Sequence, residues 1–201
     1  MKIIYNIPNI IRMAGMERIL AIKANYLAGL TGMEVVIITY EQKNLPLAFD
    51  FSDKIRFYDL DIDYAACRGK NIFWNKIRRI IYTKRHQRRL EEILLKEKPI
   101  TIYMMTGRER EWLYRLKDGS KKILECHFSY FSYQNVKGII NRYKIKRFLN
   151  KIKYYDRLVV LTEEDRKDWG RKDNIVVIPN ALTFYPKESA DVCQHKKDLI
   201  V

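Results

Sequence analysis

The chain has 201 residues, of which 47% are hydrophobic and 12% aromatic, and it carries a formal net charge of +15. This composition excludes an intrinsically disordered chain, allows one α/β domain with a hydrophobic core, and indicates an anionic partner. No apolar run reaches the roughly 18 residues of a membrane span. Three distant cysteines exclude a disulfide framework and a zinc site, so we expect reduced thiols and a cytoplasmic protein: Cys67, Cys126 and Cys193. Asn6 and Pro8 interrupt the N-terminal apolar run and no small-residue cleavage site follows, which argues against a signal peptide.

The first elements along the chain form a predicted strand–loop–helix–strand unit. Lys2–Ile7 is mostly apolar and stops at a proline, which is typical of a buried strand. A loop that contains Gly15 leads into a helix, whose apolar face carries Met16, Leu20, Ala24, Leu27 and Ala28. Gly32 fits the region that caps this helix, and Val35–Thr39 is a second buried strand. The order implies that the two strands are parallel.

The remaining elements continue this alternation. Further strands are expected at Ile55–Leu60, Ile100–Met105, Ile123–Cys126, Leu158–Leu161 and Ile175–Ile178. Helices are expected at Asn71–Lys96, Arg108–Leu116, Ile139–Tyr155 and, capped by Thr162, through Trp169. The pattern predicts a doubly wound, mainly parallel Rossmann-like sheet with helices on both faces, over residues 1–182. Residues 183–201 are expected to form a linker and the start of another strand.

The positive charge is concentrated in two segments. Arg68–Lys98 contains 11 Lys or Arg and 3 Glu, and Lys137–Arg157 contains 8 Lys or Arg and one Asp, so together they account for the whole net charge. In the second segment Ile145, Phe148, Leu149 and Ile152 share one helical face. Such concentration points to a particular anionic neighbour.

Three interpretations of the basic helices are open. They can be solvated charged faces, or they can attach to an anionic membrane through Lys144, Arg147 and Lys151. In the membrane interpretation, interfacial contacts would come from Phe148, Ile152, Tyr154 and Tyr155. Nucleic acid is the third and least favoured partner: 14 tyrosines are available for stacking, but no nucleic-acid-binding motif is present.

The loop Met13–Arg18 is the first candidate for chemistry. Gly15 allows a ligand to approach the backbone, and the free N–H groups of a helix start attract a phosphate or a sugar hydroxyl. The alternative is a glycine that serves only a tight turn. Arg18 is either an anion-binding residue or a structural ion-pair partner, and the second role is the commoner one.

Five segments resemble family-4 retaining glycosyltransferases in order and approximate spacing. Ala14–Arg18 is similar to the Gly-Gly-x-Glu-Arg opening of that family, and Ala24–Ala28 to the Asn-x-Leu helix that follows. Glu125–Phe128 resembles the Glu-x-His segment after a central strand. Leu158–Asp165 resembles a strand-then-helix segment, and Val177–Asn180 the hinge between the two domains.

The resemblance implies the N-terminal, acceptor-side half of a GT-B architecture. The whole enzyme would move a hexosyl-type sugar from a nucleotide-diphosphate sugar to a glycan or lipid-linked glycan acceptor, with retention of configuration, in cell-surface polysaccharide synthesis. The family needs no metal or other cofactor. Many members act on lipid-linked acceptors at the inner face of the membrane, so the expected location is cytoplasmic and peripheral to that membrane.

Two departures from the family pattern stand out. Ala14 replaces the first glycine of the opening motif. Either its methyl group narrows the space through which a ligand approaches the loop, or the loop accommodates the methyl group without effect. The second domain, which in the family holds the donor through a basic pair and a Glu-x7-Glu segment, is absent. Lys196–Val201 looks like its first strand. We therefore expect an incomplete enzyme with little activity by itself.

His127 is the residue to which the resemblance gives a catalytic role. It follows a central strand, and in the family the matching histidine orients the transferred sugar, either by donating to a hydroxyl or by steadying charge in the transition state. A histidine without catalytic duty is the alternative. Substrate contacts are expected at Ala14, Gly15, Met16, Arg18 and Glu163. The rival function is a non-catalytic basic module that binds an anionic membrane or nucleic acid.

Overall fold

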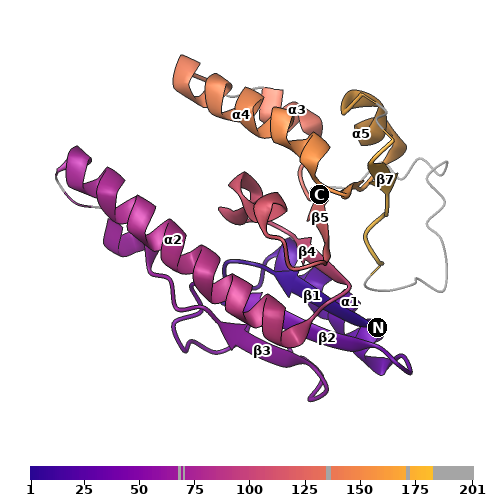
Figure 1. The fold of residues 1–201 in the computed structure, drawn as a ribbon. Coiled ribbons are helices and arrows are strands. Elements are labelled where there is room, and N and C mark those ends of the chain that lie inside the picture. The colour runs from indigo at the N-terminus through magenta and orange to yellow at the C-terminus, as the bar shows by residue number, and fades with distance from the viewer. Residues whose placement is uncertain (68, 70, 135–136, 171–172, 183–201) are drawn as a thin grey trace, which may run out of the picture.

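A computed structural model describes residues 1–67, 69, 71–134, 137–170 and 173–182 (Figure 1). Within them a seven-stranded sheet has the order β3-β2-β1-β4-β5-β6-β7, and every neighbouring pair is parallel. The strands are β1 (Lys2–Asn6), β2 (Glu34–Thr39), β3 (Arg56–Asp59), β4 (Thr101–Met104), β5 (Lys121–Glu125), β6 (Arg157–Val160) and β7 (Ile175–Val177). The linker and further strand expected over residues 183–201, with Cys193, lie outside the described residues.

Helices cover both faces of this sheet, which confirms the predicted doubly wound α/β fold. The α-helices are α1 (Gly15–Gly29), α2 (Ile72–Glu97), α3 (Tyr130–Gln134), α4 (Ile139–Lys151) and α5 (Glu163–Asp168). Short 3₁₀ turns are η1 (Tyr64–Cys67), η2 (Glu109–Glu111), η3 (Leu113–Arg115) and η4 (Ile152–Tyr154). None of these helices combines the length and apolar character that would let it cross a bilayer.

Several short elements differ from the sequence expectation, among them η1, which the sequence does not predict. The helix expected over Arg108–Leu116 is instead two 3₁₀ turns, η2 and η3, and the end of the second basic helix tightens into η4. Helix α3 was not expected from the sequence. Short segments such as these place few residues on a repeating face, so their pattern carries little helical signal.

Two hydrophobic clusters lie on opposite faces of the sheet because side chains alternate along each strand. On one face α1 packs through Leu20 and Ala24 against Ile3 and Tyr5 of β1. On the other face, Ile4 belongs to the cluster that buries Leu90 and Leu94 of α2 and Phe148 of α4. Figure 1 shows α2 running across that face, with α4 beyond it.

Helix α2 is packed only along its C-terminal half. Asn71 caps its start by accepting from the backbone N–H groups of Phe73 and Trp74, and Lys98 ends it in the left-handed conformation before a proline. The buried residues of the helix begin at His86. The N-terminal half therefore extends away from the sheet (Figure 1), on the side where the strands end.

Candidate functional site

The loops after β1, β4 and β5 meet at one edge of the sheet, because these parallel strands are neighbours and end together. A buried ion pair ties α1 to this edge: Lys23 Nζ contacts Glu125 Oε1 at the end of β5. The Glu125 side chain is 1% exposed and that of Lys23 18% exposed. The pair holds the carboxylate of Glu125 in place, and Glu125 precedes His127 by two residues in the sequence.

His127 lies next to this pair and is itself buried. Its Nε2 atom is 3.6 Å from Glu125 Oε1, and its side chain is 7% exposed. Burial lowers the pKa of His127, and nearby Lys23 lowers it further, whereas the carboxylates of Glu125 and Glu17 raise it. Burial is the largest of these effects, so the imidazole is neutral at pH 7 and can donate or accept a single hydrogen bond at each nitrogen.

Polar atoms without hydrogen-bond partners lie around His127. In the described structure His127 Nε2, Glu125 Oε2 and Glu17 Oε2 are buried and make no hydrogen bond. Glu17 belongs to the first turn of α1, and its carboxylate raises the pKa of His127. Buried polar groups normally have partners, so these atoms are suited to a hydroxyl-bearing ligand.

A cavity of about 230 Å³ opens beside His127. We call it the His127 cavity; the residues that line it include Met105, Arg110, Glu125, His127 and Phe128. None of the predicted α1 residues lines this cavity. The structure therefore places His127 in the wall of this cavity, and Lys23 joins α1 to the neighbouring Glu125.

The start of α1 has the open backbone that ligand approach requires. Ala14 occupies the N-cap position without a side-chain cap, so the first N–H groups of the helix receive no side-chain partner from it. A Cβ atom placed on Gly15 meets nothing within 4 Å, and its φ is not in the left-handed region. The turn itself therefore does not require glycine, and this weakens the alternative in which Gly15 serves only the turn.

Gly15→Ala is expected to fold normally and to be more stable by up to about 1 kcal/mol, since alanine loses less backbone entropy in a helix. The same methyl group would crowd the acceptor that the family resemblance implies at the helix start, so its binding should weaken. Chemical denaturation measures the change in stability, and the affinity for that acceptor measures the change in binding. A loss of stability would show that the turn needs glycine.

The other predicted contacts differ in position. Met16 is half-buried and packs against the α1 core cluster, whereas Arg18 is exposed and has no carboxylate partner within the described structure. Glu163 is exposed in the first turn of α5 and pairs with Arg166 at 3.6 Å. Thr162 caps α5 by accepting from the N–H of Asp165, as the sequence predicts.

A buried polar cluster beneath the same edge was missed from the sequence. The Glu109 carboxylate is fully buried: Asn6 Nδ2 donates to its Oε1 at 3.0 Å, and His86 Nε2 is 3.1 Å from the same atom. The other nitrogen of His86 lies 3.1 Å from the Tyr64 hydroxyl. The cluster connects β1, α2, η1 and η2 below the loop after β4. From the sequence, His86 is recognised only as part of a basic helix. Its partners Tyr64 and Glu109 are distant along the chain, so no local pattern predicts their contact.

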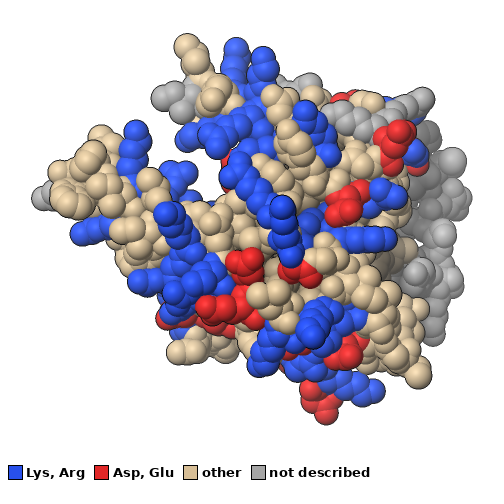
Figure 2. Space-filling view, viewed as in Figure 1, with Lys and Arg blue, Asp and Glu red and all other residues tan. Residues whose placement is uncertain are grey.

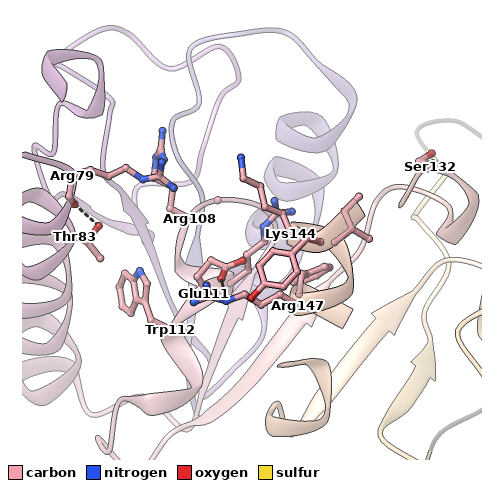
Figure 3. Close-up of a pocket in the computed structure, with 13 residues that line it drawn as sticks. Arg79, Thr83, Arg108, Glu111, Trp112, Ser132, Lys144 and Arg147 are labelled. Atoms are coloured by element: carbon pink, nitrogen blue, oxygen red, sulfur yellow. Dashed lines mark hydrogen bonds and ion pairs between the residues drawn. The ribbon is translucent and has the colours of Figure 1, made fainter. Parts of the chain in front are cut away.

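A second hollow, the basic cleft, lies between α2, α4 and the loop after β4, with a volume of about 620 Å³ (Figure 3). Its charged lining residues are Arg79, Arg108, Arg110, Glu111, Lys144 and Arg147. Figure 2 shows Lys and Arg along both helices that border it. The basic cleft and the His127 cavity share Arg110, Ser132 and Phe148, so the two spaces adjoin.

Lys151 does not belong to an open basic face. It is 8% exposed, and its ammonium group contacts Glu111 Oε2 and donates to the Glu111 carbonyl at 3.0 Å. Phe148, Ile152 and Tyr155 are also buried. The expected membrane contact through Lys151, Phe148, Ile152 and Tyr155 is therefore wrong, because these side chains face the protein, whereas Tyr154 is exposed. Lys144 and Arg147 remain exposed.

Among the described residues no group of three or more His, Cys, Asp or Glu is arranged to hold a metal ion. The sequence matches no protein-family model, and no curated protein is significantly similar to it.

Several solved structures are similar to the chain, and two of them show the shared fold well. One is the apo form of the lipopolysaccharide outer core galactosyltransferase WaaB, with a TM-score of 0.59 and 14% identity over 90% of this chain and 46% of that chain. The other is sucrose-phosphate synthase from Thermosynechococcus elongatus, with a TM-score of 0.64 and 13% identity over 89% of this chain and 47% of that chain. The similarity shows the fold of one Rossmann-like half of a GT-B glycosyltransferase. The chain thus spans about half the length of these structures.

Proposed function

We propose that the chain is the acceptor-side half of a glycosyltransferase that uses a nucleotide-diphosphate sugar. The observation that carries this proposal is the set of unpartnered polar atoms of His127, Glu125 and Glu17, which the ion pair of Lys23 holds at the carboxyl edge of the sheet. The GT-B half fold supports it, because such edges bind ligands. We further propose that transfer retains the anomeric configuration and that it serves cell-surface polysaccharide synthesis. Both proposals rest on the motif resemblance to family-4 retaining glycosyltransferases.

In this proposal His127 contacts a hydroxyl of the reacting sugar. A neutral imidazole held in a dry site can donate to that hydroxyl and steady the charge that develops as the bond to the leaving phosphate breaks. The acceptor hydroxyl attacks the anomeric carbon, and the departing phosphate oxygen takes its proton. The chain therefore needs no further base. The donor nucleotide is held mainly by a second domain.

The test joins the chain to a nucleotide-sugar-binding second domain and measures release of the nucleoside diphosphate and transfer of the sugar. The joined protein should be active, whereas each part alone should show little activity, since one wall of the reaction cleft is then missing. A joined protein that binds the donor but neither hydrolyses nor transfers the sugar would refute the proposal.

We also propose that the protein attaches to an anionic membrane, through the projecting end of α2. Three consecutive large apolar side chains are exposed there: Ile72 (79%), Phe73 (67%) and Trp74 (55%). Lys76, Arg78 and Arg79 follow them. Exposed aromatic residues beside cations are typical of interfacial helices, and each basic residue near an anionic surface contributes up to about 1 kcal/mol. Lipid-linked acceptors would be reached from this position.

Replacing both Phe73 and Trp74 by serine is expected to reduce binding to anionic vesicles by at least tenfold, since two buried aromatic rings contribute more than 1.4 kcal/mol. Flotation with vesicles that contain phosphatidylserine measures the loss. Leu95→Ser is the matched control, because Leu95 is 57% exposed at the packed end of the same helix. Equal flotation of the control and the double variant would contradict attachment through this end.

A further inference from the structure

The basic cleft contains more positive charge than the protein itself neutralises. Five of its lining residues are Lys or Arg and one is acidic. That one carboxylate, on Glu111, is already contacted by Lys151, and Arg147 lies 4.0 Å from it. In the part of the chain that is described, Arg79, Arg108, Arg110 and Lys144 have no carboxylate within ion-pair distance. Like charges gathered in a hollow repel one another, so the cleft is complementary to a multiply charged anion.

The geometry positions these cations around a shared space. Arg79 comes from α2, Lys144 from α4, and Arg108 from the loop after β4, and Figure 3 shows them around one opening. The guanidinium of Arg108 is held over the Tyr64 ring at 4.3 Å, and that of Arg110 over the Phe148 ring at 4.9 Å. A guanidinium held over an aromatic ring is oriented by the ring, while its N–H donors, which lie in the plane of the guanidinium, remain available to an anion.

The size and chemistry of the cleft select the class of ligand. A volume of about 620 Å³ lies within the range of small-molecule sites, and it is concave, so a flat bilayer does not fill it. Guanidinium groups bind phosphate oxygens by paired hydrogen bonds. Four unneutralised cations match the two or three negative charges of a diphosphate better than the single charge of a carboxylate.

We propose that the basic cleft is a binding site for a diphosphate group. The site adjoins the His127 cavity through Arg110, Ser132 and Phe148, so a diphosphate held there lies next to the proposed transfer site. The diphosphate can come from a lipid-linked acceptor or from a nucleotide. The inference goes beyond the proposed function, since diphosphate binding does not depend on sugar transfer or on His127.

The test measures binding of inorganic pyrophosphate to the full chain by calorimetry. Arg79→Gln and Lys144→Gln should each weaken binding about tenfold, the loss expected when a hydrogen bond to a charged group is removed. Arg78→Gln and Lys146→Gln are matched controls: they remove the same charge from neighbouring positions on the same helices, but neither residue lines the cleft. These controls should change affinity by less than about twofold, as exposed charges do.

Two further arms identify the source of the diphosphate. Tighter binding of geranyl diphosphate than of pyrophosphate would support the site and assign it to a lipid-linked acceptor, whereas tighter binding of UDP would support it and assign it to the donor. Absence of pyrophosphate binding, or equal weakening by all four variants, would overturn the proposal. His127→Ala should leave pyrophosphate binding unchanged, so a failure of the transferase proposal is distinguishable from a failure of this one.

Discussion

His127→Ala in the joined two-domain protein is expected to lower kcat for sugar transfer by about 10²- to 10³-fold, the range found when a positioned donor or general acid–base group is removed. The imidazole lies at the wall of the His127 cavity, 3.6 Å from Glu125. In the proposed function its loss removes a contact to the reacting sugar. Single-turnover rates at saturating donor separate this loss from weaker binding.

The variant must remain folded for this result to be informative. Nε2 of His127 makes no hydrogen bond within the described structure, so its removal takes no hydrogen bond from a buried partner. We expect a loss of stability limited to packing. His127→Gln, which keeps a donor and an acceptor, should recover part of the rate. Unchanged transfer by His127→Ala would refute the assigned role.

Lys23→Met is expected to destabilise the chain by about 3 kcal/mol, because removal of one partner leaves a buried carboxylate without its counter-charge. The side chain of Glu125 is 1% exposed, so water cannot replace the lost ammonium group. The free energy of unfolding from urea titration measures the effect. The double variant Lys23→Met/Glu125→Gln should recover much of the loss, since the uncompensated charge is then absent.

An exposed ion pair supplies the control for Lys23→Met. Lys43 and Asp63 lie 3.1 Å apart with side chains 48% and 43% exposed. Lys43→Met should therefore cost less than about 1 kcal/mol. Similar losses from Lys23→Met and Lys43→Met would mean that the pair of Lys23 and Glu125 is not buried as described, and the positioning of His127 would lose its support.

The sheet could be predicted from sequence because its strands carry their own signal. Val35–Thr39 is almost entirely buried between two helical layers, and buried parallel strands appear as continuous apolar runs. Asn71 and Thr162 bond to backbone groups two or three residues ahead. Such local interactions are visible in a single sequence.

The candidate site depends on pairs of interacting side chains that lie far apart along the chain. Lys23 and Glu125 come from different elements, as do His86 and Glu109. Neither pair has a spacing rule, since their contact follows from the order of strands in the sheet. The membrane contact predicted for Lys151 is wrong for the same reason: its partner Glu111 comes from η2, 40 residues earlier in the chain. The basic cleft likewise requires two helices that meet only in the fold.

We propose that the first turn of α1 and His127 form one site. The titration of His127 in the Glu17→Gln variant tests this proposal most directly. In the unaltered chain we expect NMR to show a His127 pKa lower than that of an ordinary exposed histidine, because burial disfavours the imidazolium. The carboxylate of Glu17 raises that pKa, so Glu17→Gln should lower it further.

Glu163→Gln serves as the control, because Glu163 is exposed and pairs with Arg166 instead. We expect the pKa of His127 to shift downward in Glu17→Gln and to stay unchanged in Glu163→Gln. An unchanged pKa in Glu17→Gln, or a His127 pKa in the unaltered chain above that of an ordinary exposed histidine, would contradict a single site formed by His127 and the first turn of α1.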